Sequence, residues 1–360
     1  MFCTQPFNHI DIVVENDKVL LQPCNVWTAK RYSINEYNKA LPDLKQTLEH
    51  TYHYPGCSRC FMEDKKNIRS RRKAQNEFAN DNNLSNQKLQ SLGVRYGTLC
   101  NSKCMICSHH RSSSWVADAE KLGLHVNDQH RYKKHLLPGV DIFFENFDLD
   151  DLRFVEFHGG EPLMQTYPED FLSRVKHLDQ LIVKFNTNLT ILPSDRLMQL
   201  LKQCKRVDFL LSVDDIDERY EILRFPGKWK IFTKNLEFIK KQNFRAMAYN
   251  CLSSLNIYYC GDYYNWAIKN FGAGVHSQFV VDQKMLDISY LPKNAKDKVL
   301  RKIEKYTGQI FDSIRSKLHL DNEDHSLDLI NYIKKLDAIR NTRFSKTFSE
   351  WWQILNGDLS

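Results

Sequence analysis

Short apolar segments alternate with longer amphipathic segments through the middle of the chain. Six of the short ones have the length and the β-branched and aromatic content of strands: 92–98, 153–159, 181–187, 207–213, 244–250 and 275–281. Four of the longer ones have helical character: 167–179, 192–204, 229–242 and 260–272. This alternation predicts βαβ crossovers and a parallel α/β sheet. Six units are too few for a closed eight-stranded barrel, so we expect a partial (β/α)6 TIM-like barrel that is open on one side.

The two ends of the chain have different patterns. Residues 9–24 alternate apolar and polar positions around a Glu-Asn-Asp turn, which predicts a β-hairpin. Ser33 and Glu36 match a capping box that opens a helix over 33–50. The expected domains are a small α+β domain over 1–75, an Asn-rich linker over 76–90, the barrel over 91–290 and a helical C-terminal extension over 291–360.

Composition and charge add little to this picture. Apolar residues make up 42% of the 360 residues, which is enough for a sizeable core, and the net charge of +7 does not require a nucleic-acid partner. The basic excess is concentrated in one run of six residues: Lys65, Lys66, Arg69, Arg71, Arg72 and Lys73. Such a run can bind phosphates, but we interpret it as a solvated helix face.

The role that we expect for the cysteines depends on the cellular compartment of the protein. No apolar segment approaches the ~20 residues of a membrane span, and the N-terminal sequence lacks the pattern of a secretory signal. We therefore expect a cytoplasmic protein with no membrane partner. Thiols stay reduced in the cytoplasm, so the ten cysteines indicate metal or redox chemistry before disulfides.

Three cysteines lie together after the first predicted strand. Cys100, Cys104 and Cys107 have the spacing C-x3-C-x2-C. Thiolates are the usual ligands of iron–sulfur clusters and of zinc. A four-iron cluster held by three cysteines keeps one iron open to another molecule, so this set favours catalysis over a structural role. Zinc is the alternative, and it would need a fourth ligand such as His109 or His110.

Three further motifs also follow predicted strands. Gly-Gly-Glu-Pro lies at 159–162, Asn-Thr-Asn at 186–188 and Ser-Val-Asp-Asp at 212–215. The carboxyl ends of parallel barrel strands meet at one end of the barrel, where active sites form. Because Gly159 and Gly160 lack side chains, the backbone there can approach a ligand closely. We expect these motifs and the cysteine triplet to make one site.

The cysteine triplet, followed one strand later by Gly-Gly-Glu-Pro, resembles the radical S-adenosylmethionine (radical SAM) superfamily over roughly residues 90 to 285. The resemblance implies a 4Fe–4S cluster on Cys100, Cys104 and Cys107 whose open iron binds SAM. Reductive cleavage of SAM would then form a 5′-deoxyadenosyl radical that abstracts hydrogen from a substrate. Ile106 stands where the family commonly has an aromatic residue, and it would supply apolar contact near the adenine.

The resemblance also implies contacts to the methionine part of SAM. Glu161, beside Gly159 and Gly160, would accept hydrogen bonds from the SAM ammonium. Arg224 would meet the SAM carboxylate. A surface ion pair is the alternative role for Arg224.

The ribose contacts are implied in the same way. Ser212 and Asp214 would bond the ribose hydroxyls, and Asn186 or Asn188 would contact the ribose or the methionine portion. The structural alternatives are that Asp214 caps the next helix and that both asparagines are turn residues.

A second group of cysteines lies near the N-terminus: Cys3, Cys24, Cys57 and Cys60. This segment is similar to the twitch domain, the shorter relative of the SPASM domain, which implies a second 4Fe–4S cluster held by all four. Twitch domains usually follow the barrel, whereas this segment precedes it. Structural zinc and unrelated buried thiols are the alternatives. The remaining cysteines have no partner spacing and are interpreted as core or surface thiols: Cys204, Cys251 and Cys260.

Ligand count bears on the reaction. An auxiliary cluster with four protein ligands cannot bind substrate, but it can take an electron from a substrate radical. We therefore expect net oxidation of a peptide or protein side chain, or of a carbohydrate, with a flavodoxin- or ferredoxin-type electron donor. The rival functions are a zinc- or Fe–S-bearing protein that binds nucleic acid or modifies RNA, and a redox-sensing interaction protein.

Overall fold

The computed structural model describes residues 3–15, 17–50, 54–65, 70–128, 131–133 and 137–358. The chain divides into two compact units. The first unit comprises Met1–Leu99, Tyr132–Asn186 and Pro193–Asp208, and the second comprises Cys100–Arg131, Thr187–Leu192 and Phe209–Ser360. Each unit combines segments from several of the domains expected from the sequence, so those domain boundaries stay a prediction.

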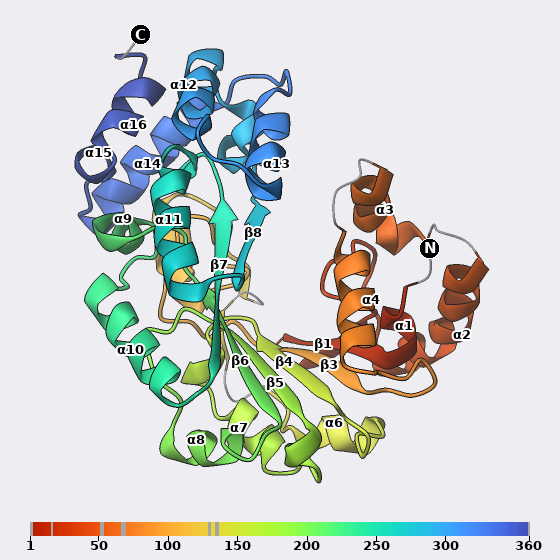
Figure 1. Ribbon diagram of the computed structural model, residues 1–360. Helices are drawn as coiled ribbons and strands as arrows, with labels where there is room; N and C mark the ends of the chain where they lie inside the picture. Colours follow the sequence, from red (N-terminus) through yellow and green to blue (C-terminus); the bar gives the residue numbers. More distant parts are fainter. Residues whose placement is uncertain are drawn as a thin grey trace. The chain divides into compact units, whose positions relative to one another are not determined.

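The strands form one open, mostly parallel sheet in the order β2-β1-β3-β4-β5-β6-β7-β8 (Figure 1). Their bounds are β1 His9–Glu15, β2 Lys18–Gln22, β3 Ser91–Tyr96, β4 Phe154–His158, β5 Ile182–Thr187, β6 Arg206–Ser212, β7 Arg245–Leu252 and β8 Val275–Phe279. Strands β3 to β8 are the six predicted strands, and they follow one another in chain order. The prediction of a partial, open α/β barrel is therefore confirmed.

The predicted N-terminal hairpin is present, but it also extends the barrel sheet. β1 pairs with β2 in antiparallel fashion and with β3 in parallel fashion, from His9 beside Ser91 to Val14 beside Tyr96. Six of the seven residues of β1 are buried, as expected for a parallel strand covered on both faces. Its sequence predicts a hairpin, whereas its second neighbour is more than 80 positions away and is found only through tertiary pairing.

The two faces of the sheet differ in polarity, because successive side chains of a strand point to opposite faces. Phe157 packs on the helix that follows β4, with its ring centroid 5.7 Å from that of Phe171. On the opposite face the register aligns Asp11 with Gly93, and Gly93 with Glu156. A Cβ at Gly93 would lie 1.8 Å from Asp11 Oδ1, so only glycine leaves room for this carboxylate. The face therefore carries buried charge.

The helices of the first unit come from the N-terminal segment and from the segments that precede β4 and follow β4 and β5. They are α1 Gln5–Asn8, α2 Ile34–His50, α3 Ser58–Lys65, α4 Arg71–Asp81, α6 Asp141–Asn146, α7 Tyr167–Leu172 and α8 Asp195–Leu201. The predicted capping box is confirmed: Ser33 N donates to Glu36 Oε2 at 2.8 Å, and Glu36 N donates to Ser33 Oγ at 3.4 Å. α7 ends seven residues before the end of the helix predicted over 167–179. Directly after it, the Ser173 hydroxyl donates to the carbonyl of Asp170, a local bond that competes with continuation of the helix.

The basic run differs from its interpretation as a solvated face. Arg72 is buried and forms an ion pair with Asp64, and Arg71 lies 3.6 Å from Glu156. The interpretation is therefore wrong for Arg72, because a buried charge requires a partner. Lys66 and Arg69 lie outside the described residues. α4 also covers the first part of the expected linker.

The second unit holds the other helices, including the predicted C-terminal extension. They are α5 Val116–Lys121, α9 Asp217–Leu223, α10 Trp229–Lys241, α11 Cys260–Phe271, α12 Lys293–Ile303, α13 Gln309–Leu318, α14 Ser326–Arg340, α15 Phe344–Thr347 and α16 Ser349–Leu355. α14 buries Leu329, Ile333 and Leu336 along one face. None of the helices within the described ranges has the length and apolar content needed to cross a membrane.

Candidate functional site

The cysteine loop, residues 100–107, is anchored through its backbone to the end of α9. Lys103 N donates to Phe225 O at 2.6 Å, and Met105 N donates to Leu223 O at 2.8 Å. These two bonds lie on either side of Cys104. Residues 103–105 and 223–225 are therefore hydrogen-bonded in the manner of two paired strands, although neither segment is a strand.

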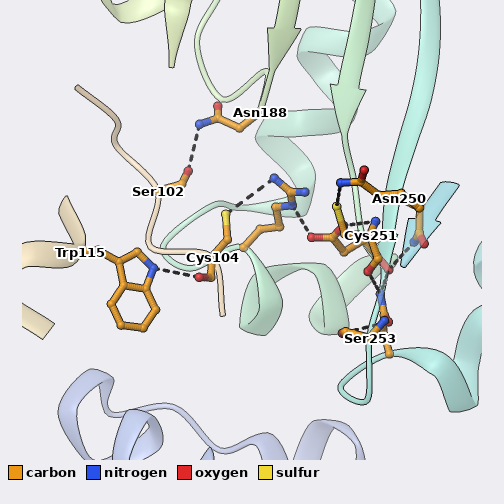
Figure 2. A network of polar contacts seen from close by, with 11 residues as sticks. Ser102, Cys104, Trp115, Asn188, Asn250, Cys251 and Ser253 are labelled. Atoms are coloured by element: carbon orange, nitrogen blue, oxygen red, sulfur yellow. Dashed lines mark hydrogen bonds and ion pairs between the residues drawn. The ribbon is translucent and has the colours of Figure 1, made fainter. Parts of the chain in front are cut away.

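Three side chains from the segment after the loop hold its carbonyl groups. Ser114 Oγ donates to Cys100 O at 2.5 Å, and Ser112 Oγ donates to Ser102 O at 2.7 Å. Trp115 Nε1 donates to Cys104 O at 2.9 Å, as Figure 2 shows. The sequence analysis missed these supports. The run of three serines followed by tryptophan is the signal that could have indicated them, because such side chains hydrogen-bond nearby backbone readily.

Two N–H groups are directed at cysteine sulfurs of the loop. Ser102 N donates to Cys100 Sγ at 3.4 Å, and Arg224 Nη1 donates to Cys104 Sγ at 3.7 Å. Burial raises the pKa of the Cys104 thiol, and the Arg224 guanidinium opposes that rise. Burial, with Cys104 nearby, raises the pKa of Cys107 to about 12. A metal would therefore have to displace these protons on binding.

The donor set fits a cluster that is held by three thiolates. All three thiols lie in one short, well-anchored loop, and N–H donors reach two of them. In the described ranges, no group of three or more His, Cys, Asp or Glu side chains is already arranged to hold a metal ion. The ligand assignment therefore rests on spacing and donor chemistry, and it stays a prediction.

Arg224 and Asp214, the two residues assigned to the SAM carboxylate and to the ribose, contact each other. Arg224 Nε lies 2.8 Å from Asp214 Oδ2. Arg224 is only 7% exposed and Asp214 only 2%, so this ion pair is buried and the alternative of a surface pair is wrong. Asp214 does not cap α9, whose N-cap residue is Ile216. The capping alternative is therefore wrong as well.

The two asparagines have different positions. Asn186 lies inside β5, and its Nδ2 donates to Glu156 Oε1 at 2.9 Å, so the turn alternative is wrong for it. Asn188 follows β5, and its Oδ1 accepts from Thr190 N at 2.9 Å in an Asx turn. Asn188 Nδ2 donates to Ser102 Oγ at 3.0 Å. Asn188 therefore ties the end of β5 to the cysteine loop.

The Gly-Gly-Glu-Pro motif forms a tight turn against the residues that precede the loop. Gly159 and Gly160 have φ of +89° and +53°. A Cβ at Gly160 would lie 2.2 Å from the carbonyl oxygen of Leu99, the residue directly before Cys100. Glu161 N donates to the same carbonyl at 2.7 Å, and Glu161 Oε1 accepts from Leu163 N at 3.1 Å. The buried carboxylate thus caps the short 3-10 helix Pro162–Met164.

Ser212 and Ile106 are the remaining residues that were predicted to contact SAM. Ser212 is the last residue of β6, and Ile106 is half-buried in the cysteine loop. Their contacts to SAM stay predictions. A cavity of about 580 Å³ in the second unit lies beside the loop, and Cys107, Trp115, Met285 and Tyr332 contribute to its lining. The sequence did not indicate this cavity, because its walls come from distant segments.

The four N-terminal cysteines lie in or beside different elements of the first unit. Cys3 precedes α1, Cys24 follows β2, Cys57 ends the 3-10 helix Pro55–Cys57, and Cys60 is in α3. Burial raises the pKa of Cys3 to about 11 and that of Cys57 to about 12, and the thiol of Cys60 adds to both shifts. Burial also raises the pKa of Cys24, with smaller contributions from Cys3 and Cys60. The thiols of Cys3 and Cys60 therefore influence the protonation of both Cys24 and Cys57.

The surroundings of these thiols are apolar and tightly packed. Cys24 and Cys57 pack against the small core cluster of Trp27, Leu44 and Leu48. Gly56 supports this arrangement, because a Cβ there would lie 2.4 Å from the Trp27 ring. In the described ranges no three of these thiols are already grouped around a common metal position, so the twitch-like assignment stays a prediction.

The comparison with family models decides the central assignment. Residues 94–265 match the model of the radical SAM superfamily. These residues resemble a radical SAM domain, and they make up just under half of the chain. The matched family implies a 4Fe–4S cluster and SAM as the cofactors of such a domain.

Solved structures of radical SAM enzymes also resemble the chain, at low similarity. Native anSMEcpe with bound AdoMet has 15% identity and a TM-score of 0.39, and the match covers 63% of each chain, less than two thirds of that protein's length. Streptococcus suis SuiB bound to S-adenosylmethionine has 13% identity and a TM-score of 0.38, over 90% of this chain and 72% of that one. SuiB bound to precursor peptide SuiA has 14% identity and a TM-score of 0.38, over 86% and 70%. No curated protein matches the chain.

Proposed function

We propose that this chain is a radical SAM enzyme that abstracts hydrogen from a peptide or protein side chain or, as a second choice, a carbohydrate. The observation that carries the proposal is a C-x3-C-x2-C loop inside the region that matches the radical SAM superfamily, with N–H donors directed at the sulfurs of Cys100 and Cys104. When bound, the cluster supplies the electron that cleaves SAM into methionine and a 5′-deoxyadenosyl radical.

The chain's own residues hold and shield this chemistry. The hydrogen bonds from Ser112, Ser114 and Trp115 keep the cysteine loop in one shape, which is what a cofactor site needs from its protein. Glu161 is buried beside the two glycines and would accept hydrogen bonds from the ammonium of SAM. Ser212, Asn186, Asn188 and Ile106 are the further proposed contacts.

The N-terminal cysteines are proposed to hold a second 4Fe–4S cluster that accepts an electron from the substrate radical. The proposal is supported by the electrostatic influence of Cys3 and Cys60 on the thiols of Cys24 and Cys57, and by the packing of Cys24 and Cys57 against one apolar cluster. The reaction would then be a net oxidation. A flavodoxin- or ferredoxin-type protein of the cytoplasm would reduce the cluster of the cysteine loop.

The nucleic-acid function receives less support from the structure. In the described part of the basic run, Arg71 pairs with Glu156, and Arg72 and Lys73 pair with Asp64. Charges that are already paired attract a phosphate backbone less strongly.

The deciding experiment is anaerobic reconstitution with iron and sulfide, followed by dithionite and SAM. Wild type should release 5′-deoxyadenosine, and Cys104→Ala should lower that release by at least about 100-fold. Cys204→Ala is the matched control and should retain the activity. Intact SAM after incubation with fully loaded, reduced wild type would contradict the proposal, and tight RNA binding by such a protein would favour the nucleic-acid function.

A further inference from the structure

Arg224 lies directly opposite Cys104. The backbone bonds from Lys103 to Phe225 and from Met105 to Leu223 flank these two residues on both sides. They fix Cys104 and Arg224 at the same level of two adjacent segments. The hydrogen bond from Arg224 Nη1 to Cys104 Sγ therefore follows from how the loop is anchored, as well as from the rotamer of a long side chain.

Asp214 fixes the orientation of the guanidinium. Its Oδ2 lies 2.8 Å from Arg224 Nε, while its Oδ1 accepts from Cys251 N at 2.9 Å. Its backbone carbonyl accepts from the side-chain amides of Asn250 and Asn256, each at 2.9 Å. Figure 2 shows this network, which extends from Ser253 to the sulfur of Cys104. Both carboxylate oxygens of Asp214 are thus engaged inside the protein.

This arrangement has a direct electrostatic consequence for a cluster bound through Cys104. Reduction adds a negative charge to an iron–sulfur cluster, and hydrogen bonds to its sulfurs are among the factors that set its potential. A guanidinium is always protonated, and its charge is screened little when it is buried. A donor at this sulfur stabilises the reduced state more than the oxidised state, because the reduced cluster is more negative.

We propose that Arg224, oriented by Asp214, hydrogen-bonds the Cys104 thiolate and raises the reduction potential of the SAM-binding cluster, and that it does not serve as the anchor of the SAM carboxylate. This proposal rests on the proposed function of the cysteine loop. It assigns Arg224 a tuning role at the cluster ligand, and it makes Asp214 a positioning residue that acts through Arg224.

The test is an anaerobic redox titration followed by electron paramagnetic resonance, on the full-length, cluster-loaded protein. The signal that changes on SAM addition identifies the cluster of the cysteine loop. Arg224→Met and Asp214→Asn should shift its potential to more negative values, and Arg224→Lys should shift it less, because lysine keeps the charge and loses the planar fork. SAM affinity should change by less than about threefold, which is under 1 kcal/mol. Arg219→Met is the matched control, since Arg219 pairs with Asp215 and Asp262.

Two results would overturn the proposal. The first is an unchanged potential in all three variants. The second is a loss of SAM affinity of about tenfold or more in Arg224→Lys and Arg224→Met, which would assign the guanidinium to the carboxylate. If Arg224→Met fails to load iron, Arg224→Lys and Asp214→Asn carry the test. Failure of the proposed function is a separate outcome, namely a wild-type cluster that never yields 5′-deoxyadenosine at any potential.

Discussion

The two groups of cysteines reach proximity by different routes. In the cysteine loop the three thiols lie within eight residues, and hydrogen bonds from the segment directly after the loop hold its carbonyls. The N-terminal thiols come from three segments, and the hairpin and the long helix α2 separate these segments in the chain. Two of them, Cys24 and Cys57, pack against the same small apolar cluster. One group is thus built by local backbone geometry, and the other is built by packing.

The difference teaches what a bound metal would contribute in each place. A metal on the cysteine loop would join residues that the backbone already holds in one short turn. A metal on the N-terminal cysteines would cross-link segments far apart in the chain and would remove much more conformational entropy from the unfolded state. A metal on the cysteine loop would therefore contribute mainly to catalysis. A metal on the N-terminal cysteines would also stabilise the fold of the N-terminal segment, in addition to any redox role.

The largest expected effect concerns the stability of the metal-loaded protein. Cys24→Ala/Cys57→Ala should lower the free energy of unfolding by about 3–5 kcal/mol, because it opens long cross-linked loops. Cys100→Ala/Cys107→Ala should cost about 1 kcal/mol, since the loop stays hydrogen-bonded. Anaerobic urea unfolding followed by circular dichroism measures both, with Cys204→Ala as control. Equal losses in the two double variants would remove the distinction between the two groups.

The next effect concerns the turn that precedes the cysteine loop. Gly160→Ala should destabilise the protein by about 2–4 kcal/mol, because it combines left-handed strain with a clash against backbone. Gly123→Ala is the control, since Gly123 also has a positive φ, +74°, and nothing lies within 4 Å of the position that an added methyl group would take. It should cost only about 1 kcal/mol. Urea midpoints that coincide would show that close backbone approach at Gly160 is not a constraint.

A smaller effect concerns the buried charge on the sheet face of the first unit. Burial by itself would raise the pKa of Glu156, but Lys184, Arg71 and His158 outweigh it and lower the pKa to about 2. A carboxyl with a lowered folded-state pKa contributes stability above its unfolded pKa near 4.5 and loses it as pH falls towards 2. Wild type should therefore lose about 2 kcal/mol more than Glu156→Gln between pH 4.5 and pH 2.

Urea unfolding at a series of pH values measures that acid loss. Asp151→Asn is the control, because the Asp151 carboxylate is solvent-exposed and its pairing should matter little. Parallel acid profiles for wild type and Glu156→Gln would show that buried charge does not stabilise this face. The first unit would then depend on its apolar packing alone.

The smallest effect concerns the support of the cysteine loop by the end of β5. Asn188→Ala removes the bonds to Asn101 and Ser102 and should cost about 1 kcal/mol locally. Amide hydrogen exchange should then quicken in residues 101–105. Asn186→Ala, which breaks a bond to Glu156 in the first unit, should leave that exchange unchanged. Faster exchange in both variants would mean that the loop is not supported locally.

Much of the fold was accessible from the sequence, because strand and helix periods are local properties. The six barrel strands, the capping box at Ser33 and the C-terminal helices all followed from patterns within a few residues. The pairing of β1 with β3 could not be predicted in this way, because the sequence of a hydrophobic strand does not indicate which other strand it will pair with. The burial of Arg72 was missed for the same reason: its partner and its cover become adjacent to it only in the folded chain.

By itself, the sequence determined the family that this chain resembles. The spacing of the three thiols and the Gly-Gly-Glu-Pro motif each lie within a few residues, so both can be recognised without the folded structure. Only the tertiary structure decided what each polar group contacts. Arg224 and Asp214 pair with each other and reach Cys104 because loop, helix and strand end converge there. The energy of a buried charge depends on which groups surround it, and residues distant in sequence supply those groups.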